Sequence, residues 1–127
     1  MREILFKAKR LDNGEWVEGT PLFNPDMSKG KILSFAEYLG NDEISFYHYA
    51  VDSDTICQYA GINSERGERI FEGDRIYFKA YGLDYIGTVE FYAGAFCVVC
   101  DSASPYLDDV IIRHGGIVIG NIHDKED

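Results

Sequence analysis

The residue pair whose type and spacing could do chemistry is Cys97 and Cys100, separated by two valines. Two thiols three residues apart have the spacing of a zinc-ligand pair or a redox pair. This pair falls in a predicted strand, where residues three apart point to opposite faces, whereas zinc and redox pairs lie on turns or at helix starts. We predict that Cys97 and Cys100 neither bind zinc nor form a disulfide, and that they and Cys57 are reduced thiols.

The histidines and carboxylates do not form a recognisable catalytic pattern. His48, His114 and His123 occur singly, without the His-x-x-x-His or His-x-His spacing of metal ligands. Asp52 to Asp54 and Asp108-Asp109 bring acids together, but the other oxygen ligands of a calcium loop are missing from the sequence. We therefore expect no catalytic residues, no metal ligands and no cofactor. A small metal-dependent enzyme stays an alternative.

Composition favours strands over long helices. The chain has 127 residues, of which 46% are hydrophobic and 14% aromatic, with nine Tyr, eight Phe and thirteen Gly. This length predicts one domain with a single core, spanning residues 1–127. No apolar run approaches the ~20 residues that cross a bilayer. We expect a cytoplasmic protein without a membrane partner.

Charge argues against non-specific binding to nucleic acid. The 22 acidic and 12 basic residues give a formal net charge of −10, and phosphate backbones attract the opposite sign. An acidic protein that mimics nucleic acid and occupies a host DNA-binding protein would use this charge directly, so this function stays an alternative.

Residues 61–122 carry the strongest structural signal. The turn formers Glu72-Gly73-Asp74, with Gly73 expected at positive φ, lead into a strand over residues 75–79. A second strand begins at Gly87 with apolar and polar residues in alternation, and Ala93-Gly94 turns it into a third. These elements predict a small antiparallel barrel of the SH3-like kind.

Residues 1–60 predict an N-terminal β-hairpin extension. Strands over residues 4–9 and 15–19 flank the turn formers Asp12-Asn13-Gly14. Trp16, the one tryptophan of the chain, faces the hairpin partner, which favours a core anchor over a binding platform.

The remaining chain is assigned by the same signals. Residues 24–31 read as a loop, and residues 32–39 fit a helix or a strand equally. Further strands are expected over residues 43–51, 55–60, 110–113 and 117–122, followed by a frayed tail over residues 123–127. One common core is expected to contain Ile76, Phe78, Val89, Phe91, Phe96 and Ile119.

In the order of its motifs the chain resembles the YopX proteins of phages and prophages. The matching blocks are Met1-Arg2-Glu3-Ile4, Trp16-Val17-Glu18-Gly19, Gln58 to Ile62 with Gly67 to Asp74, Gly87 to Phe96, and Val118 to Ile122. Within these blocks the residues that we single out are Trp16, Gln58, Tyr59, Gly61, Gly67, Glu72, Gly73, Asp74, Gly87, Gly94, Phe96, Gly120 and Asn121. The chain departs from the family pattern at Lys9, Cys57 and Ala60.

The resemblance implies a phage or prophage origin and a β-rich fold. It implies no activity, because the family has no established one, and its recurrent residues are of the types that fix backbone geometry. Together with the missing catalytic pattern, this favours a non-catalytic module that binds a phage or host protein or associates with itself.

Overall fold

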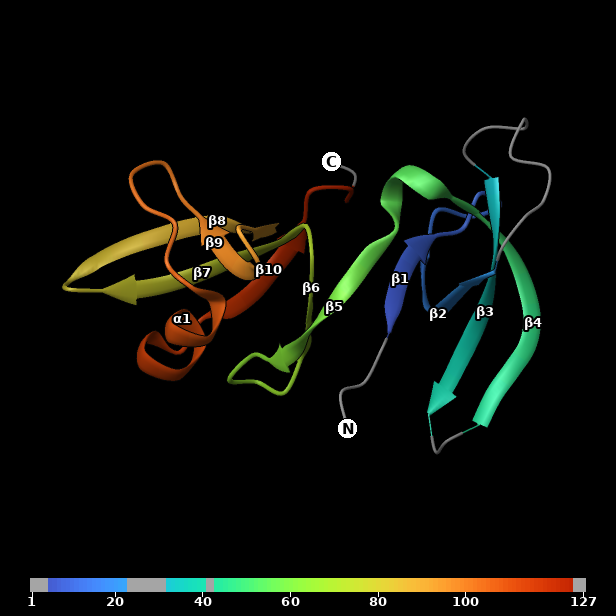
Figure 1. Cartoon of the computed structure of the whole chain (residues 1–127), viewed down its shortest axis with the longest axis horizontal. Coiled ribbons are helices and arrows are strands. Elements are labelled where there is room, and N and C mark those ends of the chain that lie inside the picture. Colours follow the sequence, from blue (N-terminus) through green and yellow to red (C-terminus); the bar gives the residue numbers. More distant parts are fainter. Residues whose placement is uncertain (1–4, 23–31, 41–42, 125–127) are drawn as a thin grey trace. The chain divides into compact units, whose positions relative to one another are not determined.

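A computed structural model describes residues 5–22, 32–40 and 43–124. The chain divides between Gln58 and Tyr59 into two compact units, whose elements are labelled in Figure 1. The strands are β1 (Phe6–Lys9), β2 (Trp16–Leu22), β3 (Ile32–Gly40), β4 (Glu43–Asp52), β5 (Cys57–Asn63), β6 (Arg69–Phe71), β7 (Asp74–Ala80), β8 (Leu83–Tyr92), β9 (Ala95–Val99) and β10 (Ile117–Asn121). The helix α1 is Leu107–His114, and a 3₁₀ turn covers Ser53–Thr55. That the whole chain folds as one domain stays a prediction.

The first unit is an antiparallel sheet with the strand order β4-β3-β2-β1 and the start of β5 beside β1. The predicted N-terminal hairpin is confirmed, because β1 pairs with β2 from Phe6 opposite Gly19 to Lys9 opposite Trp16. Residues 32–39, which the sequence left open between helix and strand, lie in β3. The expected loop over residues 24–31 lies outside the described residues.

The core of the first unit does not use Trp16 as its anchor. Buried Ala8, Val17 and Val51 form this cluster. Trp16 is half-buried, and its ring lies beneath the ammonium groups of Lys7 and Lys9, at 4.5 and 5.2 Å from the ring centroid. Because adjacent strand residues face opposite sides, burying Val17 places Trp16 on the other face, and the predicted anchor is wrong.

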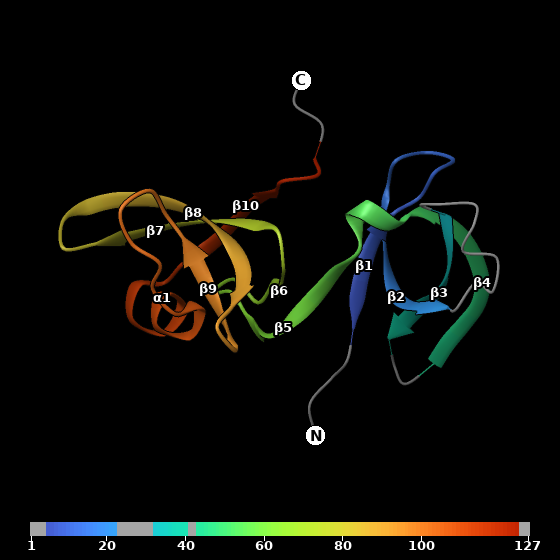
Figure 2. The same cartoon turned by 45° about the horizontal axis from the view of Figure 1, so that its top comes forward.

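The second unit is built on an antiparallel sheet with the strand order β10-β7-β8-β9. The helix α1 packs against β7 and β9 (Figures 1 and 2), and β5 pairs with β6. The side chains that pack together between these elements are Ile70, Ile76, Phe78, Ala80, Val89, Val98, Leu107, Val110 and Ile111, with Phe96 and Cys100 packed against them.

Two predictions for this region are corrected. The expected closed SH3-like barrel is not formed by the described strands, since β10 and β9 are the two unjoined edges of the sheet. The expected strand over residues 110–113 is part of α1. Leu107, Val110 and Ile111 are its buried residues, and this i, i+3, i+4 spacing is the helical one. A helix in this position covers the sheet instead of adding a strand to it.

The predicted common core is right at Ile76, Phe78 and Val89 and wrong at two positions. Phe91 is 56% exposed and Ile119 is 47% exposed. Phe91 lies next to the Ala93-Gly94 turn that ends β8, and β10 changes register between Val118 and Gly120. The alternation of apolar and polar residues along a strand therefore does not predict burial near a hairpin tip or at a bulge.

The turn before β7 has the predicted geometry, with Gly73 at φ +88°. The Asp74 carboxylate is only 1% exposed and accepts hydrogen bonds from Phe71 N at 2.8 Å and from Asn121 Nδ2 at 2.9 Å. The Gly73 carbonyl accepts a bond from Ile122 N at 3.0 Å. The Phe71-to-Asp74 block and the Gly120-Asn121-Ile122 block, far apart in sequence, thus form one hydrogen-bonded junction.

The tail is held by hydrogen bonds as far as it is described. His123 N donates to Asn121 Oδ1 at 2.9 Å, and Asn121 N donates to Asp124 Oδ2 at 2.9 Å. The predicted fraying of residues 123–127 is therefore wrong at 123 and 124, where the chain forms a turn, and residues 125–127 lie outside the described ranges.

Candidate functional site

The motif residues are distributed over turns and strand junctions, and they do not form one site. Asp74 and Asn121 meet as described, and Tyr59 packs on Phe71 with ring centroids 5.6 Å apart and donates its hydroxyl to Asn63. Gly61, Gly67 and Gly94 adopt positive φ in turns or bulges. Gln58 lies near the start of β5, Glu72 in the turn before β7, and Gly120 near the end of β10. These placements indicate that the motifs specify backbone geometry.

Cys97 and Cys100 project from opposite faces of the sheet. Cys100 packs against the core of the second unit together with Val98, whereas Cys97, on β9, lies between Phe96 and Val98 and faces the other side. Burial, and to a smaller extent the negative charge of Asp101, raises the pKa of the Cys100 thiol. A raised pKa works against a nucleophilic thiolate at neutral pH.

We expect Cys100 to be alkylated by iodoacetamide more slowly than an unstructured cysteine at neutral pH. The thiolate is the reacting species, so the rate should climb with pH to a midpoint above the ordinary value for a thiol. Removing the neighbouring charge in Asp101→Asn should move this midpoint down. Mass-spectrometric rates of labelling across pH measure it, and fast labelling of Cys100 near neutrality would contradict the raised pKa.

The acidic pairs and histidines that were considered as possible metal ligands have local structural positions where the structure describes them. Asp52 Oδ1 accepts a bond from Asp54 N at 3.0 Å and so caps the 3₁₀ turn. His114 ends α1. Among the described residues no group of three or more His, Cys, Asp or Glu side chains is arranged to hold a metal ion. Within the same ranges, no helix has both the length and the apolar character that crossing a bilayer requires.

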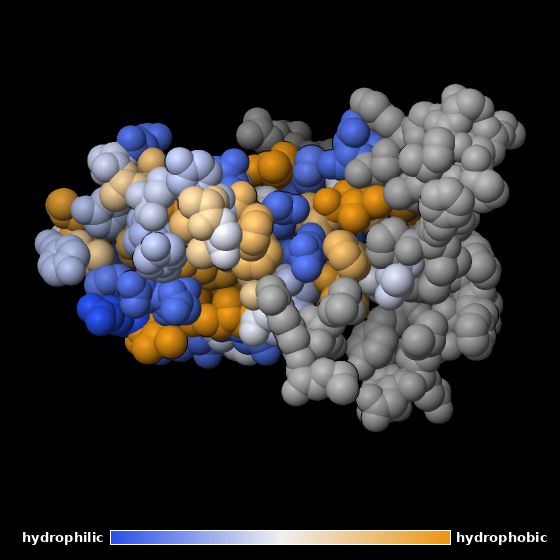
Figure 3. All heavy atoms as spheres, in the orientation of Figure 1, coloured by the Kyte–Doolittle hydropathy of each residue, from blue (hydrophilic) through white to orange (hydrophobic). Residues whose placement is uncertain are grey.

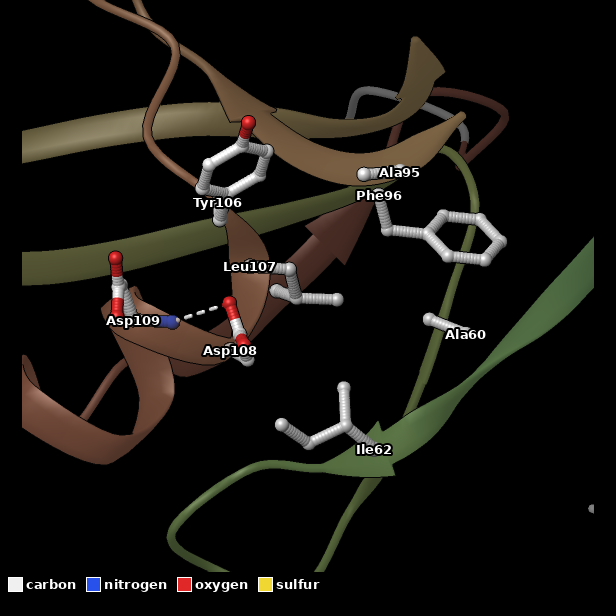
Figure 4. Close-up of a pocket in the computed structure, with 8 residues that line it drawn as sticks. All are labelled: Ala60, Ile62, Ala95, Phe96, Tyr106, Leu107, Asp108 and Asp109. Atoms are coloured by element: carbon white, nitrogen blue, oxygen red, sulfur yellow. Dashed lines mark hydrogen bonds between the residues drawn. The ribbon is translucent and has the colours of Figure 1, made fainter. Parts of the chain in front are cut away.

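A candidate binding site is a hollow of ≈ 450 Å³ in the second unit, between α1, β5 and β9. Its lining residues are Ala60, Ile62, Ala95, Phe96, Tyr106, Leu107, Asp108 and Asp109. We call it the acidic-edged hollow. In Figure 4, Leu107 and Ile62 point into the space between α1 and β5, and Phe96 faces Ala60. A hollow of this size accepts one or two side chains of a partner.

The two carboxylates at the edge come from the first turn of α1. Asp108 and Asp109 are both exposed, and Asp109 N donates to Asp108 Oδ1 at 2.8 Å, the contact drawn in Figure 4. Asp109 also lies 3.6 Å from Arg113, one helical turn on. Acids in a first turn are stabilised by the helix dipole, so their presence alone has a structural reason. In this hollow, the two carboxylates place negative charge beside the apolar side chains of the lining.

An exposed aromatic side chain extends the apolar surface of this hollow. Phe91, at the end of β8, packs edge-on against the Phe96 ring with centroids 5.1 Å apart. Phe91 is exposed and not part of the core, so its ring is available to a partner next to Phe96. Figure 3 shows hydrophobic residues reaching the surface between hydrophilic ones on the visible side of the second unit.

Sequence reasoning did not find this hollow. Of its lining residues only Phe96 was among the motif residues, and Asp108-Asp109 was considered only as a possible pair of calcium ligands. The helical spacing from Leu107 to Ile111 is the signal that could have placed the two acids at a helix start.

The fold and the site define a mainly β protein of two antiparallel sheets and one short helix, with a surface hollow. The chain belongs to the YopX family, whose model, described as YopX protein, matches residues 5–126. The predicted membership is confirmed.

Among solved structures, the chain is similar to protein EF1440 from Enterococcus faecalis. The two share 24% sequence identity over 97% of this chain and 95% of that chain, with a TM-score of 0.62. This likeness supports the fold alone. A comparison with curated proteins finds no match.

Proposed function

We propose that this YopX protein is a phage- or prophage-encoded, non-catalytic module that acts in the host cytoplasm by binding another protein at the acidic-edged hollow. The observation that carries the proposal is the adjacency of an apolar floor and two exposed carboxylates. Ile62 and Phe96, both partly exposed, supply apolar surface, and Asp108 and Asp109 supply charge. Anchor side chains in pockets with a polar rim provide most of the energy of protein interfaces.

The charge of the edge suggests the chemistry of the partner. A segment that places an apolar side chain against Ile62 and Phe96 and a lysine or arginine near Asp108 would satisfy both parts of the hollow. The protein's net charge of −10 would also steer a basic segment toward it. The partner class is therefore a basic, apolar peptide segment.

A defined peptide tests this proposal. An acetylated peptide alternating lysine with leucine and phenylalanine should bind, and the charge reversal Asp108→Lys with Asp109→Lys should weaken binding about tenfold, since exposed ion pairs are each worth up to ~1 kcal/mol. Isothermal calorimetry at about 0.1 M salt measures the affinity.

The matched control is Glu90→Lys, another exposed acid, on the sheet face opposite Val89. It changes charge in the same way, and its expected effect is below about twofold. Equal weakening by Glu90→Lys, or equal binding of an all-lysine peptide, would show general attraction to an acidic surface and would refute the site.

Nucleic-acid mimicry is less well supported by the distribution of acids. A mimic needs carboxylates in regular rows, but exposed acids of the second unit come from a hairpin end, a strand, a loop and a helix. They include Asp84, Glu90, Asp101 and Asp108. Capture of a host DNA-binding protein that is displaced by duplex DNA would favour the mimic instead.

Self-association remains a further prediction. The strand β10 lies at one edge of its sheet and carries the exposed Ile119. Exposed strand edges pair readily with copies of themselves. Sedimentation of the protein across concentrations measures this directly.

A further inference from the structure

A second hollow of ≈ 400 Å³ lies in the same unit and has a different lining. Aromatic rings come from β7, the β7–β8 hairpin and the end of α1, and the loop before α1 closes one side. The rings belong to Phe78, Tyr81, Tyr85 and His114. We call it the ring-lined hollow. It adjoins the acidic-edged hollow at Asp109, which lines both.

The rings contact one another in a chain. Phe78 stacks on Tyr85 with centroids 5.2 Å apart, and it lies 6.0 Å from the His114 ring. The Tyr81 ring also meets the His114 ring edge-on, with centroids 5.9 Å apart. Offset and edge-on packing of this kind is how aromatic rings prefer to meet, so a further ring entering the hollow would extend the same pattern.

Tyr81 occupies a backbone position that favours other residues. It has φ +52° and is followed by Gly82 at φ +78°, so both central residues of the two-residue hairpin turn are left-handed. Asn-Gly and Asp-Gly are the favoured pairs in such turns, and a bulky residue there is strained. The side chain is 92% exposed, so burial does not compensate. A strained, exposed ring at the mouth of a ring-lined hollow points to a binding role.

The polar groups of the lining identify the ligand. Arg113 can lie over the face of a bound ring as a cation–π partner, and the Asp109 carboxylate and Ser104 hydroxyl can accept a hydrogen bond from its N–H or O–H. We propose that the ring-lined hollow receives a tryptophan or tyrosine side chain of a bound protein. Tyr81 forms one wall of this pocket.

Other ligands fit the lining less well. A lysine or arginine side chain would meet Arg113 and His114, both of which would oppose a cation when charged. The lining offers a metal ion one carboxylate, Asp109, one imidazole, His114, and one thiol, Cys100, and among the described residues these three are not arranged to hold a metal ion. A nucleotide would be repelled by the net charge of −10. An aromatic side chain uses the rings, the guanidinium and the carboxylate together.

The inference rests on the proposed protein-binding function and adds a second pocket to it. The probe is N-acetyl-tryptophanamide, followed by NMR titration of the ¹⁵N-labelled protein, with N-acetyl-lysinamide and N-acetyl-leucinamide as comparisons. We expect saturable shifts at Tyr81, Asp109 and His114 with a dissociation constant on the order of 1 mM, as for a small fragment.

Tyr81→Asn separates binding from stability. It should weaken binding of the tryptophan amide about fivefold or more and raise the Tm by roughly 4 °C, because asparagine suits this turn. The matched control is Ala93→Asn, since Ala93 has the same φ of +52° before Gly94 in the other hairpin. The control should raise the Tm similarly and leave binding unchanged.

Several results would overturn the inference. They are the absence of saturable shifts at these residues, equal binding of the lysine amide, and a Tyr81→Asn variant that binds normally. A lower Tm in Tyr81→Asn than in the unchanged protein would show that the ring has a structural role instead. Asp108→Lys should not affect the tryptophan amide, so failure of this pocket and failure of the acidic-edged hollow are measured separately.

Discussion

Replacing Asp74 with alanine is expected to destabilise the second unit by roughly 3–5 kcal/mol. Its buried carboxylate accepts bonds from Phe71 N and Asn121 Nδ2. Removing it leaves two buried donors without this acceptor, and each such loss costs about 1–3 kcal/mol. A loss of this size is a large share of the stability of an ordinary domain.

Urea unfolding of a short series measures the effect. Asn121→Ala removes the buried bond to Asp74 and the less buried bond that Asn121 Oδ1 accepts from His123 N, and it leaves the bond from Phe71 N to Asp74 in place, so it should cost less than Asp74→Ala. The double variant should cost less than the sum because the two residues share a bond. The control is Asp84→Ala, which removes an exposed carboxylate that accepts a bond from Tyr77 at 2.6 Å. Its expected cost is within about 1 kcal/mol. Additive losses at Asp74 and Asn121 would argue against the junction.

Two further measurements on the Asp74→Ala variant test whether the two units unfold as one domain. Trp16 lies in the first unit and is the one tryptophan, so its fluorescence reports on that unit. Hydrogen exchange of β7 and β8 amides reports on the second unit. Coincident changes in both signals after Asp74→Ala would support the predicted single domain, and a change in the second signal alone would refute it.

Turns and strands were predictable from the sequence where the signal is local. Gly73 was assigned positive φ because the turn depends on a few neighbouring residues. The contact between Asp74 and Asn121 was not predictable, since the two residues are 47 positions apart and nothing local pairs them. The turn motif could therefore be recognised in the sequence, but the contact that Asp74 makes with Asn121 could not.

The helix α1 was missed because a strand and a helix both fit a short apolar run. Val110 to Arg113 reads as strand from its β-branched residues, whereas the deciding evidence lay three residues earlier, at Leu107. Once the helix is known, Gly115 at φ +61° explains where it ends. The error had a consequence, because the acidic-edged hollow is built on the start of this helix.

Neither hollow could be inferred from sequence. Ile62, Phe96 and Leu107 belong to three separate elements, and the fold alone brings them together. The sequence analysis did not use the signal at Tyr81, where a tyrosine before glycine between two strands departs from the usual turn composition.

Gly87→Ala is expected to be the most destabilising change of a single methyl group, at about 3 kcal/mol or more. A Cβ at this position would lie 2.6 Å from Val98 Cγ1, 2.7 Å from Cys100 Sγ and 2.8 Å from the Val99 carbonyl oxygen. The first two atoms can shift, but the third belongs to the backbone of β9, which pairs with β8 from Thr88 opposite Val99. Relief therefore requires the two strands to separate.

Thermal unfolding followed by circular dichroism measures this cost, and Thr88→Ala is the neighbouring control on the other sheet face. Gly87→Ala with Cys100→Ala should recover only part of the loss, because the sulfur is removed while the carbonyl oxygen remains. Full recovery in the double variant would show that the sulfur alone limits the space. A Gly87→Ala protein with unchanged Tm would show that β8 and β9 are less closely packed at this point than the structure has them.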